Sequence, residues 1–222
     1  MNKDIQLVDT NSTYKISETY IKFDLSFSES NKELIRQAFL RYVETNIEFK
    51  DSEFGKLRIS IEFDKGSLKT KIIAWGTVVY LGIANYGSFR AGLREILHDA
   101  KSLSELTVNQ LKNDPNINDN DFIRFEKRLG IPGRLNDLYK RIDSLQRNAN
   151  HYSPNELQER LAEVKQDIAD IIVILDFATR QQFINELPVN ISQNLPEPSP
   201  QDVNQWYNRY ALKPNDENDY IK

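Results

Sequence analysis

The sequence predicts an α+β fold, in which a small N-terminal βαββ layer is followed by a predominantly helical part. Three short segments of the first third alternate apolar and polar residues, which indicates strands with one buried face. Apolar residues spaced by three and four positions separate the first two of these segments and recur through most of the chain after residue 75. With 222 residues, of which 39% are hydrophobic, the chain can bury a sizeable core as one large domain or two small ones.

The first strand is predicted to begin at Tyr20. Charged or hydroxyl residues separate its apolar positions, which are Ile21, Phe23, Leu25 and Phe27. This alternation places one face of the strand on a core and the other in water. Residues 1–18 are therefore expected to form an N-terminal extension, and residues 19–74 the βαββ domain.

A helix is predicted over about 31–46, because Ser30 precedes Glu33 by the spacing of a capping box and apolar residues follow at helical intervals. Two alternating segments come next, 57–63 and 68–74, and the turn-forming residues between them predict a strand hairpin. Three strands under one helix leave sheet edges that need cover from another element or from another chain.

Residues 75–187 are predicted to form a helical domain. A long helix is expected over 76–113, where Pro115 and the residue before it end the pattern. The remainder, 121–187, is expected to fold back as an antiparallel helical hairpin. In this interpretation Gly130 follows the last residue of a helical segment and terminates it.

The second arm of this hairpin has a distinct start. Ser153 is expected to be the N-cap, with Pro154 at the first helical position and Glu156 at the third. Apolar residues then repeat in steps of four and three, the spacing of a coiled-coil seam, at Leu157, Leu161, Val164, Ile168, Ile171, Leu175 and Ala178. An arm of this length extends past the first one, so it needs the long helix or another subunit as a partner.

Residues 188–222 are predicted to be a proline-rich linker, one short aromatic helix and a tail. The aromatic helix is expected to dock onto the body of the chain, and a bound partner is the alternative. Its apolar residues are Val203, Trp206, Tyr207 and Tyr210.

The most unusual segment is 72–89, eighteen residues without a charge. As a helix it would be about 27 Å long, close to the thickness of a bilayer core. Acidic residues are absent from Lys65 to Arg94, so both flanks are basic. A buried helix is the favoured interpretation, and a membrane-associated helix or a strand reaching Val79 are the alternatives. The candidates for close helix packing or membrane contact are Trp75, Gly82, Ala84, Ser88 and Gly92.

This region also carries a resemblance. The residues concerned are Gly66-Ser67-Leu68-Lys69, the uncharged run, Tyr86-Gly87-Ser88-Phe89-Arg90-Ala91-Gly92, Ile96 and Asp99-Ala100-Lys101. They resemble a segment of small uncharacterised bacterial proteins from conflict and phage-defence gene neighbourhoods. The resemblance spans about 35 of the 222 residues, from Gly66 to Lys101. It implies a bacterial setting, a role in a multi-protein or effector system, with antiviral defence as one possibility, and no particular activity.

Composition argues against several kinds of chemistry. The chain has no cysteine, which excludes disulfides, thiolate metal sites and cysteine nucleophiles. His98 and Asp99 are adjacent on a predicted helix, where neighbouring side chains diverge and cannot form a dyad with each other. No catalytic residue, metal site or cofactor is predicted.

Basic residues gather around the predicted bend near Gly130. The candidates for a basic surface are Arg128, Arg134, Lys140 and Arg141. Such a surface could bind phosphate, but a solvated helix face is the favoured interpretation. With a net charge of −4, nucleic acid is not an expected partner.

We interpret the sequence as that of a non-catalytic interaction or assembly protein, an accessory subunit of a bacterial system. Its expected partner is a second copy or another protein, bound through the helical hairpin. One alternative is a membrane-associating effector or anchor that uses 72–89, and another is an enzyme with dispersed carboxylate and arginine side chains. The opening residues lack an apolar signal segment, so the expected location is the cytoplasm, or the inner face of the membrane for an anchor.

Overall fold

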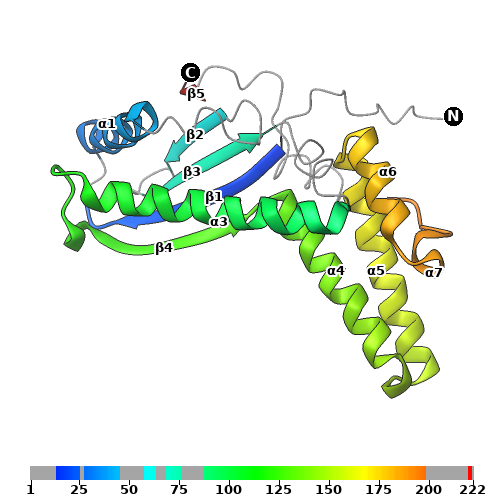
Figure 1. Ribbon diagram of the computed structural model, residues 1–222. Helices are drawn as coiled ribbons and strands as arrows, with labels where there is room; N and C mark the ends of the chain where they lie inside the picture. Colours follow the sequence, from blue (N-terminus) through cyan, green and yellow to red (C-terminus); the bar gives the residue numbers. More distant parts are fainter. Residues whose placement is uncertain are drawn as a thin grey trace, which may run out of the picture.

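The computed structural model describes residues 14–25, 28–45, 58–63, 69–76, 88–198 and 220–221. It confirms the α+β fold: an antiparallel sheet built mainly from the N-terminal part is followed by helices (Figure 1). The strand order is β4-β1-β3-β2-β5. The strands are β1 (Tyr14–Phe23), β2 (Arg58–Phe63), β3 (Lys69–Gly76), β4 (Phe122–Leu129) and β5 (Tyr220–Ile221).

Strand β1 begins six residues before the predicted start at Tyr20, so the expected extension 1–18 contains half of a strand. It pairs with β3 on one side and β4 on the other, and Ile16, Ser17, Glu18 and Thr19 are all buried. The alternation of apolar and polar residues does not identify this half of the strand, because a central strand is covered along both edges and on much of both faces.

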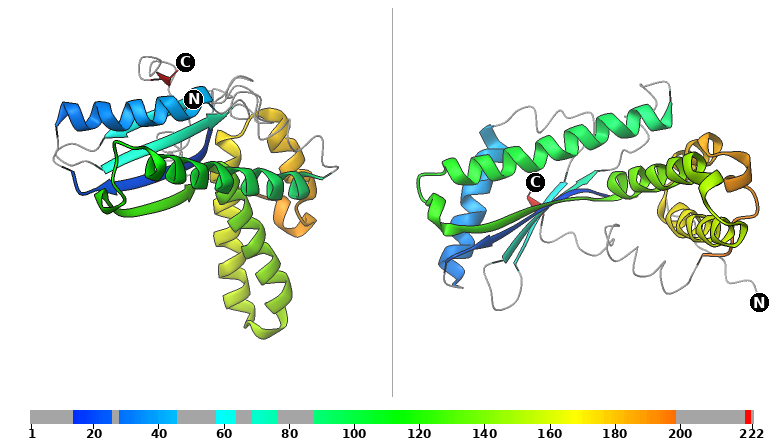
Figure 2. Two further views of the ribbon diagram at one scale, coloured as in Figure 1. Left: turned by 60° about the vertical axis from the view of Figure 1, so that its left-hand side comes forward. Right: turned by 90° about the horizontal axis from the view of Figure 1, so that it is seen from below.

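Two helices cover the same face of this sheet, α1 (Glu29–Thr45) and α3 (Phe89–Asn113). Figure 2 shows both on one side of the strands. The side chains that join the layers form one buried cluster: Ile21, Phe23, Ile35, Ala38, Ile72, Val108, Leu111 and Ile117. The predicted helix at 31–46 is therefore confirmed as α1, whose bounds differ by one or two residues.

The prediction of one helix over 76–113 is wrong at its beginning. Gly76 is the last residue of β3, and α3 begins only at Phe89, while 77–87 lie outside the described residues. The uncharged run 72–89 is thus not a single helix, because its first five residues pair with β1 and β2. Among the described helices, none is long and apolar enough to span a bilayer.

Residues 122–129 form strand β4, and the helix predicted there is wrong. β4 pairs with β1 along nearly its whole length, from Phe23 opposite Phe122 to Ser17 opposite Leu129. The predicted role of Gly130 is corrected as well, because this residue is the N-cap of the following helix. A short segment with few apolar positions fits both periods, and here pairing with β1 favours the strand.

The predicted helical hairpin is present but starts at α4 (Ile131–Asn148) and returns as α5 (Pro154–Ile174). Ser153 is the N-cap, and its hydroxyl accepts a hydrogen bond from the Glu156 N–H at 3.3 Å, which confirms the expected start. The hairpin of α4 and α5, which we call the arm, projects away from the sheet, and the turn between the two helices lies at its far end (Figures 1 and 2).

The predicted seam does not continue to Ala178 within one helix. α5 ends at Ile174, and Asp176 then caps a separate helix, α6 (Phe177–Glu186), which is followed by α7 (Val189–Ser192). Buried residues from α5, α6 and α7 share one core cluster with α3 and α4. The C-terminal half of α5 is therefore covered by other helices of the same chain.

Candidate functional site

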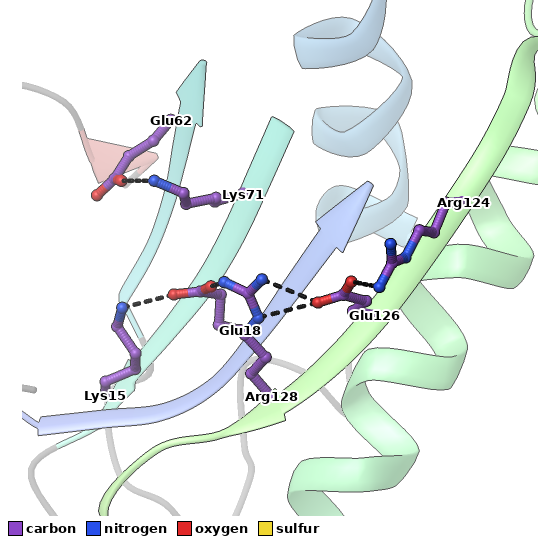
Figure 3. A network of polar contacts seen from close by, with 7 residues as sticks. All are labelled: Lys15, Glu18, Glu62, Lys71, Arg124, Glu126 and Arg128. Atoms are coloured by element: carbon purple, nitrogen blue, oxygen red, sulfur yellow. Dashed lines mark hydrogen bonds and ion pairs between the residues drawn. The ribbon is translucent and has the colours of Figure 1, made fainter. Parts of the chain in front are cut away.

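The face of the sheet opposite α1 and α3 is built from charged side chains. On β1, Glu18, Tyr20 and Lys22 alternate with the core-facing Ile21 and Phe23. The register places side chains of three other strands beside them, and Figure 3 shows several of these on the side away from the two helices. These neighbours are Arg124, Glu126 and Arg128 from β4, Lys69 and Lys71 from β3, and Glu62 from β2.

Glu18 lies at the centre of this face, with its side chain only 8% exposed. Its carboxylate accepts hydrogen bonds from Lys15 Nζ at 2.6 Å and from Arg128 Nη1 at 2.9 Å. Arg128 also donates from Nη2 to Glu126 Oε2 at 2.8 Å, and its guanidinium lies 5.0 Å from the centre of the Tyr20 ring. Arg128 thus joins β4 to β1 through one buried carboxylate and one aromatic ring.

Burial by itself raises the pKa of Glu18, but the hydrogen bonds and positive charges of Lys15 and Arg128 outweigh it and lower the pKa below its ordinary value of 4.5. A carboxyl with a lowered pKa in the folded state adds stability above its unfolded pKa and loses it as the pH falls through the folded value. Stability is therefore expected to fall with acidification below about pH 4.5. Urea titrations of wild type and Glu18→Gln at several pH values test this, since the variant should lose that part of the pH dependence.

Of the remaining pairs on this face, one crosses two strands and one lies within β4. Lys71 Nζ lies 3.9 Å from Glu62 Oε2, across β3 and β2, and Arg124 forms an ion pair with Glu126 on β4. All of these side chains are at least partly exposed, so each pair adds little stability. Chemically, the face is a set of ion pairs around Glu18, some within one strand and some between neighbouring strands.

A second cluster joins α3, α4 and α6. The Glu186 carboxylate accepts hydrogen bonds from the backbone N–H groups of Phe89 and Arg90, the latter at 3.1 Å, at the N-terminus of α3. Arg90 forms an ion pair with Asp143 and lies 4.9 Å from the centre of the Tyr139 ring. The start of α3 is thus an anion site that a carboxylate of the same chain occupies.

Aromatic rings lie beneath this ion pair. The ring centres of Tyr139 and Phe183 are 5.6 Å apart, as are those of Phe89 and Phe183. Burial raises the pKa of the Tyr139 phenol, with a smaller contribution from the Glu186 charge. The Tyr139 hydroxyl makes no hydrogen bond with the described part of the chain. We assign this junction a structural role, fixing the direction of the arm.

The four candidates for a basic surface do not come together as one patch. Arg128 belongs to β4, whereas Arg134, Lys140 and Arg141 lie on α4. Lys140 Nζ is 3.3 Å from Asp137 Oδ1, and Arg141 pairs with Asp167 of α5. Among these, Arg141 connects α4 to α5, whereas the pair of Lys140 lies within α4.

A small open pocket lies between α4 and α5. Its walls are Arg134, Asp137, Leu138, Arg141 and Asp167. Because Arg141 and Asp167 form an ion pair with each other, the pocket does not present them as free charges to a ligand.

The packing candidates from the uncharged run separate in the structure. Trp75 lies in β3 and Gly82 and Ala84 are outside the described residues. Ser88 is the N-cap of α3, where its hydroxyl accepts a hydrogen bond from Ala91 N–H at 3.1 Å, and Gly92 is buried in the same helix. Ser88 and Gly92 therefore lie at the start of α3, beside the contact between Glu186 and the first N–H groups of that helix.

Titratable residues do not form a metal site in the part of the chain that the structure describes, where no group of three or more His, Asp or Glu converges. His98 is exposed on α3, and His151 is exposed in the turn between α4 and α5.

The edge of the sheet at β4 was missed by sequence reasoning. β4 stands at the end of the strand order and, within the described residues, pairs only with β1. Two of its large apolar side chains are exposed, Ile123 by 51% and Phe125 by 43%. Arg124, Glu126 and Arg128 alternate with Phe125 and Leu129, so a period of two was present in the sequence.

Comparisons with known proteins add no name to this geometry: no protein-family model, no curated protein and no solved structure matches the chain.

Proposed function

We propose that this protein is a non-catalytic assembly protein, an accessory subunit of a bacterial system, which binds its partner by strand addition at the outer edge of β4. The observation that carries the proposal is this edge itself: eight residues, one side of which pairs with no strand among the described residues, with two exposed large apolar side chains. An exposed edge strand offers a row of backbone donors and acceptors that a second strand can satisfy.

Two further features support a role in assembly. β4 contacts β1 through the Arg128–Glu18 pair and α3 through the Lys127–Glu105 pair at 2.6 Å. These contacts with neighbouring elements hold the edge strand in place. Lys112 of α3 lies 5.8 Å from the ring centre of Phe125, which leaves that ring on the surface between helix and edge. A rigid edge lowers the entropy cost of binding a partner strand.

The test compares two double variants of the full chain. Ile123→Lys with Phe125→Lys places like charges along the edge, while Phe177→Lys with Val189→Lys changes two apolar residues on α6 and α7 that are more exposed still. Light scattering measures self-association, and affinity capture from the native cells measures binding to other proteins. We expect the edge variant to lose the association of the wild type and the control to keep it.

Equal loss or equal retention in the two variants contradicts the proposal, as does a wild-type chain that stays monomeric and captures nothing. Circular dichroism of both variants checks that the fold is retained. Because all four positions are 43% to 66% exposed, we expect only small changes in the free energy of unfolding.

A further inference from the structure

We infer that the partner at the β4 edge is a second copy of this chain, paired antiparallel with Phe125 opposite Phe125 of the second copy. This inference rests on the proposed function and names its partner and register. The observations behind it are the unpaired edge, the exposed side chains of β4 and the order of charges along the strand.

Symmetry limits the possible registers. Two antiparallel strands of one sheet are related by a two-fold axis perpendicular to the sheet. The axis passes through the midpoint of one residue and its own copy, so every other residue faces the copy of the residue equally far beyond the centre. A register is therefore specified by its central residue alone.

Most central residues are unfavourable. Centring on Arg124, Lys127 or Arg128 sets a cation opposite its own copy, and centring on Glu126 sets two carboxylates together. Centring on Ile123 leaves the end of the strand opposite residues 117–119, which precede β4. Each of these registers either places like charges opposite each other or leaves part of β4 without a strand residue opposite it.

Centring on Phe125 has neither defect. Each Arg124 then faces Glu126 of the second copy, so the symmetric pair contains two opposite-charge contacts. Phe125 faces its own copy, and aromatic pairs are favourable in this position. Arg124 pairs with Glu126 of its own strand, and in the dimer its side chain, which is 67% exposed, would exchange that carboxylate for Glu126 of the second copy or share the two.

The register also matches the faces of the sheet. Side chains of directly opposite residues point to the same face, so the Arg124 and Glu126 contacts join the charged faces of the two copies. Phe125 lies on the other face, the one that α1 and α3 cover, opposite the core residue Ile21 of β1. Phe125 of the second copy would lie on this same face of the continued sheet. The dimer would continue one sheet across two chains and remove both exposed β4 edges.

A single cysteine tests the register directly, because the wild-type chain has none. Directly opposite Cα atoms of antiparallel strands are about 4.5–5.5 Å apart, within the range that a disulfide spans. We expect the full-length variant Phe125→Cys to form a covalent dimer under mild oxidation and to return to a monomer on reduction. Phe177→Cys, at a position on α6 that is 65% exposed, should crosslink much more slowly.

Charge exchange is the second measurement and does not disturb the buried core. Arg124→Glu places two carboxylate pairs across the axis and should raise the dimer dissociation constant by roughly tenfold or more. Combining it with Glu126→Arg restores opposite charges and should recover most of the affinity. Sedimentation equilibrium on wild type and both variants measures these constants.

The outcomes separate this inference from the proposed function. A dimer that does not crosslink at Phe125→Cys faster than at Phe177→Cys overturns the register and leaves assembly by another strand pairing. A monomeric wild type that still captures a protein through the β4 edge overturns the second copy as partner but keeps the proposed function. A monomer that captures nothing overturns both.

Discussion

Replacing Gly130 by alanine is expected to lower the free energy of unfolding by more than about 4 kcal/mol, enough to leave a domain of ordinary stability largely unfolded. A Cβ on Gly130 would lie 1.7 Å from the Lys15 carbonyl oxygen and 2.5 Å from its carbonyl carbon. Both atoms belong to the backbone of β1, which is fixed by pairing with β3 and β4. Urea denaturation followed by circular dichroism measures the loss.

The matched control is Gly133→Ala, in the first turn of α4. There the nearest atom to an added Cβ is Leu129 Cβ at 2.5 Å, so the end of β4 must shift, but by less than β1 must shift for a Cβ on Gly130. Alanine also favours the helix by up to about 1 kcal/mol over glycine. We expect a clearly smaller loss than at Gly130. Equal unfolding midpoints for the two variants would show that the close approach to β1 is not the cause.

The close approach at Gly130 explains why the sequence was misinterpreted at this point. The local pattern predicts that this glycine ends a helix, a common position for glycine. In the structure its N–H donates to the Ile16 carbonyl at 3.0 Å, and it leads from β4 directly into α4. The requirement for glycine comes from β1, more than a hundred residues earlier, and no local pattern contains that information.

Elsewhere, local patterns were sufficient. The cap at Ser153 and the helix α1 follow from side chains within a few residues of each other, and both are confirmed. The first half of β1 was missed because it is buried on both sides by segments distant in sequence. Propensity and periodicity report near neighbours, whereas burial of a central strand depends on the whole sheet.

The candidate site was less predictable than the fold. The sequence predicts Arg128 as part of a basic surface, yet the structure pairs it with Glu18, 110 positions away. Charges on different strands become partners only through the register, which sequence spacing does not give. The exposed edge of β4 likewise depends on the strand order, since any strand can be central or peripheral.

The structure connects the proposed edge to the projecting arm through a short path. β4 leads through Gly130 into α4, and α4 is held at its Asp143 by Arg90 of α3. α3 in turn contacts β4 through the Glu105–Lys127 pair. A partner bound at the edge would therefore fix where the arm points, and in the symmetric dimer two arms would project in directions set by the two-fold axis.

Phe183→Ala is expected to cost about 3–5 kcal/mol, the usual range for removing a fully buried phenylalanine ring. Phe183 is 0% exposed and lies between the rings of Phe89 and Tyr139, so its loss leaves a cavity bordered by three helices. Thermal denaturation of this variant and of Phe177→Ala, whose ring is 65% exposed, gives the comparison.

The consequence should be concentrated at the junction of the arm. Phe183 lies in the same helix as Glu186, the carboxylate that accepts hydrogen bonds from the start of α3. Loosening α6 should therefore expose the first N–H groups of α3 to water, and hydrogen exchange at Phe89 and Arg90 should rise more than exchange in β1. A uniform rise across the sheet and the arm would instead indicate that the whole chain unfolds as one cooperative unit, and that the junction is not its weakest contact.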